Sequence, residues 1–147
     1  MKQYSLFALV TLGLFMASCA PATSSVAGAK VVELKALNTF AGGAPSTAKG
    51  RAELSLQADG KTKVVVTISG LTANTKHIGH IHTGTCTPGG PVAILLSEIS
   101  SDASGNGKAE TVVDTAKIPS SAYVQYHQRG AGAAEGAGAG ITCGDIK

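Results

Sequence analysis

The sequence predicts an all-β domain with the architecture of a Greek-key barrel or sandwich. Short segments of alternating or β-branched residues recur along the chain, and turn signals rich in Gly, Pro and Asp separate them. No segment convincingly repeats its apolar residues with the period of an amphipathic helix. Seven or eight short strands separated in this way are typical of sandwiches and barrels.

The predicted strands differ in the strength of their signals. Residues 63–69 are rich in valine and isoleucine, and the Asp59-Gly60 pair before them is typical of a hairpin turn. Residues 92–99 form the most continuous apolar run of the mature chain, which predicts a buried strand. Residues 130–140 are almost entirely Gly and Ala, and we expect a mobile surface loop there. The predicted strands are 30–37, 51–56, 63–69, 76–82, 92–99, 108–113, 122–128 and 141–146.

The N-terminal residues indicate export. Lys2 is followed by the apolar run 6–16, which is too short to span a bilayer, and small residues lead from there to Cys19. This order is typical of a secretory signal, and a cysteine at its end resembles a bacterial lipobox. Residues 1–18 are therefore predicted to be a lipoprotein signal peptide, with Cys19 lipidated. The alternative is an ordinary signal peptide cut nearby, with Cys19 incidental.

The mature chain divides into a tether and one domain. Residues 20–29 contain mainly Pro, Ala, Thr, Ser and Gly, which cannot bury much apolar area, so 19–29 is predicted to be a flexible tether. Residues 30–147 suffice for a single domain with its own core. We expect this domain to stand at the cell envelope, in the periplasm or on the cell surface, held to the membrane by its lipid anchor.

Cysteine usage and charge narrow the classes of function. With Cys19 assigned to the lipid, Cys86 and Cys143 remain, and an even number in an oxidising compartment predicts one disulfide. A disulfide between Cys86 and Cys143 would close a loop of nearly sixty residues and, in the chain-entropy model, stabilise the fold by about 4 kcal/mol. The chain has 12 Lys and Arg against 9 Asp and Glu, spread evenly. This small excess of positive charge argues against a nucleic-acid partner.

The four histidines predict a transition-metal site. His80 and His82 are two residues apart, so on a strand their side chains point to one face, while Gly79 and Ile81 point to the core. His77 falls on the opposite face and is expected to be structural, beside the metal rather than bound to it. His127 lies in a second strand-like run. Imidazole donors without thiolate or carboxylate suit copper or zinc.

The run from Thr62 to His82, followed by Cys86, resembles the core of copper/zinc superoxide dismutases. That family has a strand, a Gly-Leu-Thr turn, a histidine and then a copper-binding His-x-His, with a disulfide cysteine soon after. Val124-Gln-Tyr-His127 and the terminal run 140–146 resemble later parts of the same family. The resemblance implies an eight-stranded superoxide dismutase-like Greek-key barrel, with His80, His82 and His127 as copper ligands and Cys86 bonded to Cys143.

Departures from the family pattern matter as much. The family carries three further histidines in its metal loop, one of them bridging copper and zinc, whereas residues 87–101 contain no histidine. We therefore expect copper and no zinc. The family also places an arginine before its last cysteine to attract superoxide, and Gly140 stands there. Arg129, two residues after His127, is a candidate replacement; the alternative is a solvated surface charge.

Three functions follow from these patterns. The first is an exported, copper-dependent superoxide dismutase that converts superoxide to O2 and H2O2, with superoxide as its small-molecule partner. The second is a copper-binding protein for buffering or delivery, without turnover. The third is a chordin-type structural module, in which His-Ile-His precedes a Gly-Pro-Val segment as His80-Ile-His82 precedes Gly90-Pro-Val92. His127 and the two cysteines argue against the third.

Overall fold

The computed structural model describes residues 28–38, 45–129 and 137–147, and these form eight strands and one short 3-10 turn. Every predicted strand is present, with small differences in its bounds. The 3-10 turn, η1, spans Thr115–Lys117. The strands are β1 Lys30–Ala36, β2 Lys49–Leu56, β3 Lys61–Ser69, β4 Lys76–Thr83, β5 Val92–Ser100, β6 Gly107–Asp114, β7 Ala122–Arg129 and β8 Ala137–Ile146.

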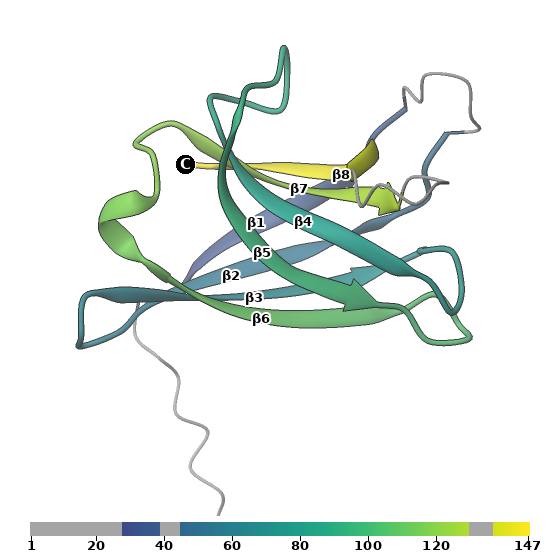
Figure 1. Ribbon diagram of the computed structural model, residues 1–147, viewed down its shortest axis with the longest axis horizontal. Coiled ribbons are helices and arrows are strands. Elements are labelled where there is room, and N and C mark those ends of the chain that lie inside the picture. Colours follow the sequence, from purple (N-terminus) through teal and green to yellow (C-terminus); the bar gives the residue numbers. More distant parts are fainter. Residues whose placement is uncertain (1–27, 39–44, 130–136) are drawn as a thin grey trace, which may run out of the picture.

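The strands form one antiparallel sheet that curls into a nearly closed barrel. Their order is β5-β4-β7-β8-β1-β2-β3-β6, so the connections from β3 to β4 and from β6 to β7 cross between the two halves, as in a Greek key. Figure 1 shows β5 and β6, the two ends of this order, running side by side. Ser97 joins them, because its N–H donates to Thr111 Oγ1 and its hydroxyl to the Glu110 carbonyl, both at 2.8 Å. The all-β barrel prediction is confirmed.

Alternating side chains fill the barrel. In β3, Val64, Val66 and Ile68 are buried, while the residues between them are more exposed, as the period of two requires. Gly79 of β4 leaves room for a large ring from β7, because a Cβ there would overlap the Tyr126 ring. Tyr126 is fully buried and its hydroxyl donates to the Ser97 carbonyl at 3.0 Å. The small residue inside the histidine strand is thus explained by core packing.

Two sequence expectations are wrong. Residues 92–99 are not a fully buried strand: Val92 is 49% exposed and Leu95 is 71% exposed. In a barrel one face of a strand points outward, and the apolar run has enough residues for both faces. The Gly/Ala run is not a loop throughout, because residues 137–140 begin β8 and pair with β7. Small residues fit this crowded position, since a Cβ on Gly140 would overlap the Gln125 side-chain amide.

The predicted disulfide is confirmed. Cys86 and Cys143 are bonded, with Cα atoms 6.0 Å apart and a sequence separation of 57. The bond ties the segment 84–91, here called the disulfide loop, to β8. The N–H of Cys86 also donates to Asp145 Oδ1 at 2.8 Å, which adds a second tie between the same two elements.

The predicted signal peptide 1–18, the lipidated Cys19 and nearly all of the tether 19–29 lie outside the described residues. Within the part that is described, no helix is both long and apolar enough to cross a membrane.

Candidate metal centre

Strands β4 and β7 bring three of the four histidines together. They pair in register, with His80 opposite Gln125, His82 opposite Tyr123 and Ile78 opposite His127. Paired residues share a face of the sheet, so the three histidine rings gather on the side away from the core, while Ile81 belongs to the core cluster. The ring centroids are 5.5 Å apart for His80 and His82, 5.1 Å for His80 and His127, and 5.7 Å for His82 and His127.

One nitrogen in each of these rings is buried and has no hydrogen-bond partner. In the described chain these atoms are His80 Nδ1, His82 Nε2 and His127 Nε2. One ring nitrogen from each of the same three histidines lies within 4.8 Å of those of the other two. A buried polar atom without a partner costs free energy, and three of them converging is explained when they share a ligand. These residues could bind a metal ion.

Two backbone carbonyls set the orientation of His82 and His127. Nδ1 of His82 donates to the Gly90 carbonyl of the disulfide loop at 2.9 Å, and Nδ1 of His127 donates to the Gly138 carbonyl of β8 at 2.9 Å. A carbonyl oxygen only accepts, so each Nδ1 carries the proton and each neutral ring leaves Nε2 with a free lone pair. Hydrogen bonds of this kind commonly orient metal-binding histidines.

The environment disfavours the protonated forms of His80 and His127. Burial, followed by the neighbouring charges that His127 and His82 would carry when protonated, lowers the pKa of His80 to about 4. Burial also lowers the pKa of His127, against the opposing effect of its hydrogen bond to Gly138. A neutral imidazole is the form that binds a metal, so the lowered pKa values of His80 and His127 favour metal binding at neutral pH.

His77 lies outside this cluster. It is 2% exposed; its Nε2 is 2.8 Å from Thr75 Oγ1 in a hydrogen bond, and its Nδ1 donates to the His127 carbonyl at 3.3 Å. The ring therefore contacts the backbone of His127, while the His127 side chain points to the other histidines.

Arg129 occupies the rim of the sheet rather than the cluster. Its Nη1 lies 3.9 Å from Glu98 Oε1 of β5, and Lys76 Nζ lies 3.6 Å from Glu98 Oε2. Arg129 also borders a small hollow of about 80 Å³, together with Lys76, His77 and other residues. Two cations therefore share one carboxylate at this edge, two residues beyond His127 along β7.

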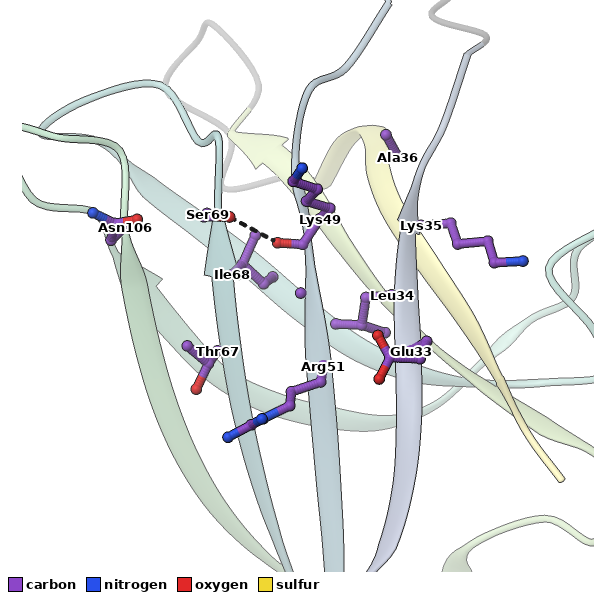
Figure 2. A pocket seen from close by; sticks show the side chains of 11 residues that line it. Glu33, Leu34, Lys35, Ala36, Lys49, Arg51, Thr67, Ile68, Ser69 and Asn106 are labelled. Atoms are coloured by element: carbon purple, nitrogen blue, oxygen red, sulfur yellow. Dashed lines mark hydrogen bonds between the residues drawn. The ribbon is translucent and has the colours of Figure 1, made fainter.

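A larger hollow lies elsewhere in the described part of the chain. It has a volume of about 910 Å³, opens beside β1, β2 and β3, and contains no histidine. Figure 2 shows Lys35, Lys49 and Arg51 around it, with the Ser69 hydroxyl directed to the Lys49 carbonyl. This hollow has no group of metal-binding side chains, so its size does not identify the functional site.

Sequence reasoning did not find Gly90, Gly138 or the role of Tyr123, which stacks on His82. The two glycines act through backbone carbonyls, which carry no side-chain signal. Alternation along 122–128 does place Tyr123 on the face of His127, but it does not show that the ring stacks on His82 of the neighbouring strand.

Comparison with solved structures supports the fold. The crystal structure of the clock protein EA4 matches with a TM-score of 0.57 at 15% identity, over 78% of this chain and 90% of that chain. A double mutant of a SOD-like protein from Bacillus subtilis matches with a TM-score of 0.54 at 17% identity, over 78% and 95%. At these identities the likeness shows a superoxide dismutase-like barrel and no more. No curated protein gave a significant sequence match.

The family comparison concerns residues 22–136, which match the CHRD domain. The matched range includes Cys86 and all four histidines and ends before Cys143. His127 and the cysteines, taken above as arguments against a chordin-type domain, are therefore compatible with one. The chain shares its fold with SOD-like proteins, and by sequence it belongs to the CHRD domain family.

Proposed function

We propose that this protein is an exported copper-binding protein that dismutes superoxide at a copper-only site formed by His80, His82 and His127. One observation carries the proposal: His80, His82 and His127 each have a buried ring nitrogen without a hydrogen-bond partner, and each places a ring nitrogen within 4.8 Å of the other two. A purely structural histidine satisfies its nitrogens, as His77 does. The convergence therefore favours a metal ligand set over a set of core histidines.

The donor chemistry favours copper. Imidazole suits copper and zinc, while the described residues offer no thiolate, because Cys86 and Cys143 are bonded to each other. The proposal includes no zinc, because residues 87–101 contain no histidine to build a second site. His80, His82 and His127 would hold the ion, and the Cu²⁺/Cu⁺ couple would supply the one-electron chemistry for oxidation of one superoxide to O2 and reduction of a second, with two protons, to H2O2.

Residues around the three histidines would orient the ligands, keep them unprotonated and attract the anion. The carbonyls of Gly90 and Gly138 keep His82 and His127 in one tautomer, with Nε2 available to the metal. Burial keeps His80 unprotonated at neutral pH. Arg129 would attract the superoxide anion from the edge of β7, with Glu98 opposing it by partly neutralising its charge.

A second candidate is copper binding without turnover, for buffering or delivery. The pairing of Arg129 with Glu98 favours it, because that carboxylate weakens the local attraction for an anion. The three candidate ligand nitrogens are also shielded from solvent, which slows the access of a small substrate. Family membership favours the third candidate, a structural module, but a module of this kind leaves the three unpartnered nitrogens unexplained.

Export and membrane anchoring are part of the proposal. A disulfide between distant elements is typical of oxidising compartments, which supports export. Lipidation of Cys19 would leave the protein at the cell envelope. Labelling the expressed full chain with a radioactive fatty acid tests this: we expect label on the wild type and none on Cys19→Ala. Label on neither protein would contradict the anchor.

Metal content and superoxide removal test the main proposal together. The mature domain is loaded with copper and zinc in competition, and the wild type is compared with His80→Ala and with Gln128→Ala, an exposed neighbour of His127. We expect about one copper per wild-type or Gln128→Ala chain, with dismutation, and neither in His80→Ala. Copper without activity would support the second candidate, and preferential zinc binding would overturn both copper functions.

A further inference from the structure

We propose that Tyr123 is a positioning residue for the metal centre, holding the His82 ring and the Gly90 peptide in the one arrangement that directs His82 Nε2 to the other histidines. This inference rests on the metal-binding part of the proposed function. It does not depend on whether the bound metal turns over superoxide.

The first contact is a stack between rings. Tyr123 of β7 is directly opposite His82 of β4, and the two rings lie parallel, with centroids 4.8 Å apart and an interplanar angle of 11°. By contrast, the angle between the rings of His82 and His80 is 76°. Tyr123 is 2% exposed, so its buried ring packs against one face of the His82 imidazole. Rotation of the imidazole out of its plane would break this contact.

The second contact is a closed set of hydrogen bonds around Gly90. The Tyr123 hydroxyl accepts from the Gly90 N–H at 2.9 Å and donates to the Gly90 carbonyl at 3.3 Å. The same carbonyl accepts from His82 Nδ1 at 2.9 Å. Tyr123 therefore holds His82 twice, by its ring directly and by its hydroxyl through the peptide group that determines the tautomer.

The backbone of Gly90 depends on the Tyr123 hydroxyl for its position. A Cβ on Gly90 would overlap the Thr83 carbonyl, so the loop passes β4 too closely for a side chain to anchor it there. Neighbouring hydrogen bonds, from the Thr83 N–H to the Pro91 carbonyl at 3.0 Å and from the Gly89 N–H to the Thr85 carbonyl at 3.1 Å, fix the ends of the turn. The N–H and the carbonyl of Gly90, which belong to two successive peptide groups, both contact the Tyr123 hydroxyl, and this fixes the direction of the carbonyl.

The chain offers a matched control on the same strand. Tyr126 is also buried and also donates its hydroxyl to a backbone carbonyl, that of Ser97, but its ring lies on the core side against Gly79. Tyr126→Phe therefore removes a buried phenol hydroxyl without touching the His82 side of the sheet. Tyr123→Phe keeps the stack and removes the hydroxyl, and Tyr123→Leu removes both.

The experiment first uses the metal-free protein. Nitrogen-15 NMR of the His82 ring distinguishes protonation at Nδ1 from protonation at Nε2. We expect a single Nδ1-protonated form in the wild type and in Tyr126→Phe, and a mixture of tautomers in Tyr123→Phe. The same tautomer in Tyr123→Phe as in the wild type would overturn the proposal, whatever the protein does with metal.

The second measurement uses Cu²⁺ alone, in competition with a chelator of known affinity. Loss of a group that orients a ligand typically lowers metal affinity by about 10- to 100-fold, so we expect roughly tenfold for Tyr123→Phe and more for Tyr123→Leu. The Cu²⁺ electron paramagnetic resonance spectrum should broaden in both variants and stay unchanged in Tyr126→Phe. Equal loss of affinity in Tyr126→Phe would assign the effect to general destabilisation and overturn the positioning role.

If Tyr123→Leu does not fold, Tyr123→Phe decides the question alone. A wild-type protein that binds no Cu²⁺ would overturn the proposed function. The tautomer comparison would still decide whether Tyr123 positions the His82 ring.

Discussion

The Nδ1 of His77 donates to the backbone carbonyl of His127 at 3.3 Å, so a histidine outside the cluster holds the strand position of one inside it. The two residues are 50 apart in sequence and lie on neighbouring strands. His77 is buried on the core side, while the His127 ring points to His80 and His82. The relationship separates a supporting histidine from the three candidate ligands, and the two kinds should respond differently to mutation.

His77→Phe should destabilise the domain and weaken, without abolishing, Cu²⁺ binding. Phenylalanine roughly keeps the volume but leaves the His127 carbonyl without this donor, at a cost of about 1–3 kcal/mol. Urea unfolding of the metal-free protein measures the loss. His80→Phe is the matched comparison and should abolish copper binding with a smaller loss of stability. Loss of copper binding in His77→Phe, with binding retained in His80→Phe, would instead indicate that His77 is a ligand.

The stability of the metal-free protein should fall as the pH drops from about 6.5 towards 4. The pKa of His80 is about 4 in the folded protein, against about 6.5 in an unfolded chain. Between these values the unfolded chain takes up a proton that the folded chain excludes, so acid favours unfolding, and above about pH 6.5 the effect vanishes. The lowered pKa of His127 acts in the same direction.

Denaturant unfolding from about pH 8 to about pH 4 checks this expectation. His80→Phe is the control, because it removes the titrating group and should show a shallower loss across the same range. An identical pH profile for the two proteins would contradict the assignment to His80.

Removing the disulfide should affect both stability and copper affinity. The double variant Cys86→Ser/Cys143→Ser should lose about 2–5 kcal/mol, as is typical for a native disulfide closing a long loop. It should also bind Cu²⁺ more weakly, because the disulfide loop carries the Gly90 carbonyl that orients His82. Thermal unfolding and chelator competition measure the two effects, and unchanged copper affinity would show that Tyr123 alone suffices to hold the loop.

Arg129 and Glu98 should have opposite effects on the proposed dismutation. Arg129→Ala should lower the rate at low salt by up to about tenfold and flatten its salt dependence, because it removes an attraction for the anion. Glu98→Gln should raise the rate, because it removes a carboxylate 3.9 Å from Arg129. Pulse radiolysis over a range of ionic strengths gives both quantities. Lys63→Ala, on β3, is the control, and rates that do not distinguish Arg129→Ala from it would exclude the guiding role.

The strand pattern was accessible from sequence because burial in a barrel repeats every two residues. Val64, Val66 and Ile68 show that period directly, and the same alternation placed His80 and His82 on one face. It failed for residues 92–99, because a continuous apolar run does not say which face is covered. Leu95 is apolar and is 71% exposed. It also failed for residues 137–140, because Gly and Ala carry little strand preference and their pairing with β7 decides their structure.

By itself, the sequence determined the all-β class, the approximate positions of the strands, the pairing of Cys86 with Cys143 and the shared face of His80 and His82. These depend on local periodicity and on residue types that are few in the chain. Only the tertiary structure decided that His80, His82 and His127 each have one ring nitrogen without a partner. It also decided that the Gly90 and Gly138 carbonyls fix the tautomers of His82 and His127, and that Tyr123 stacks on His82. Those features depend on distances of a few ångströms between residues far apart in sequence, and such distances exist only once the strands have paired.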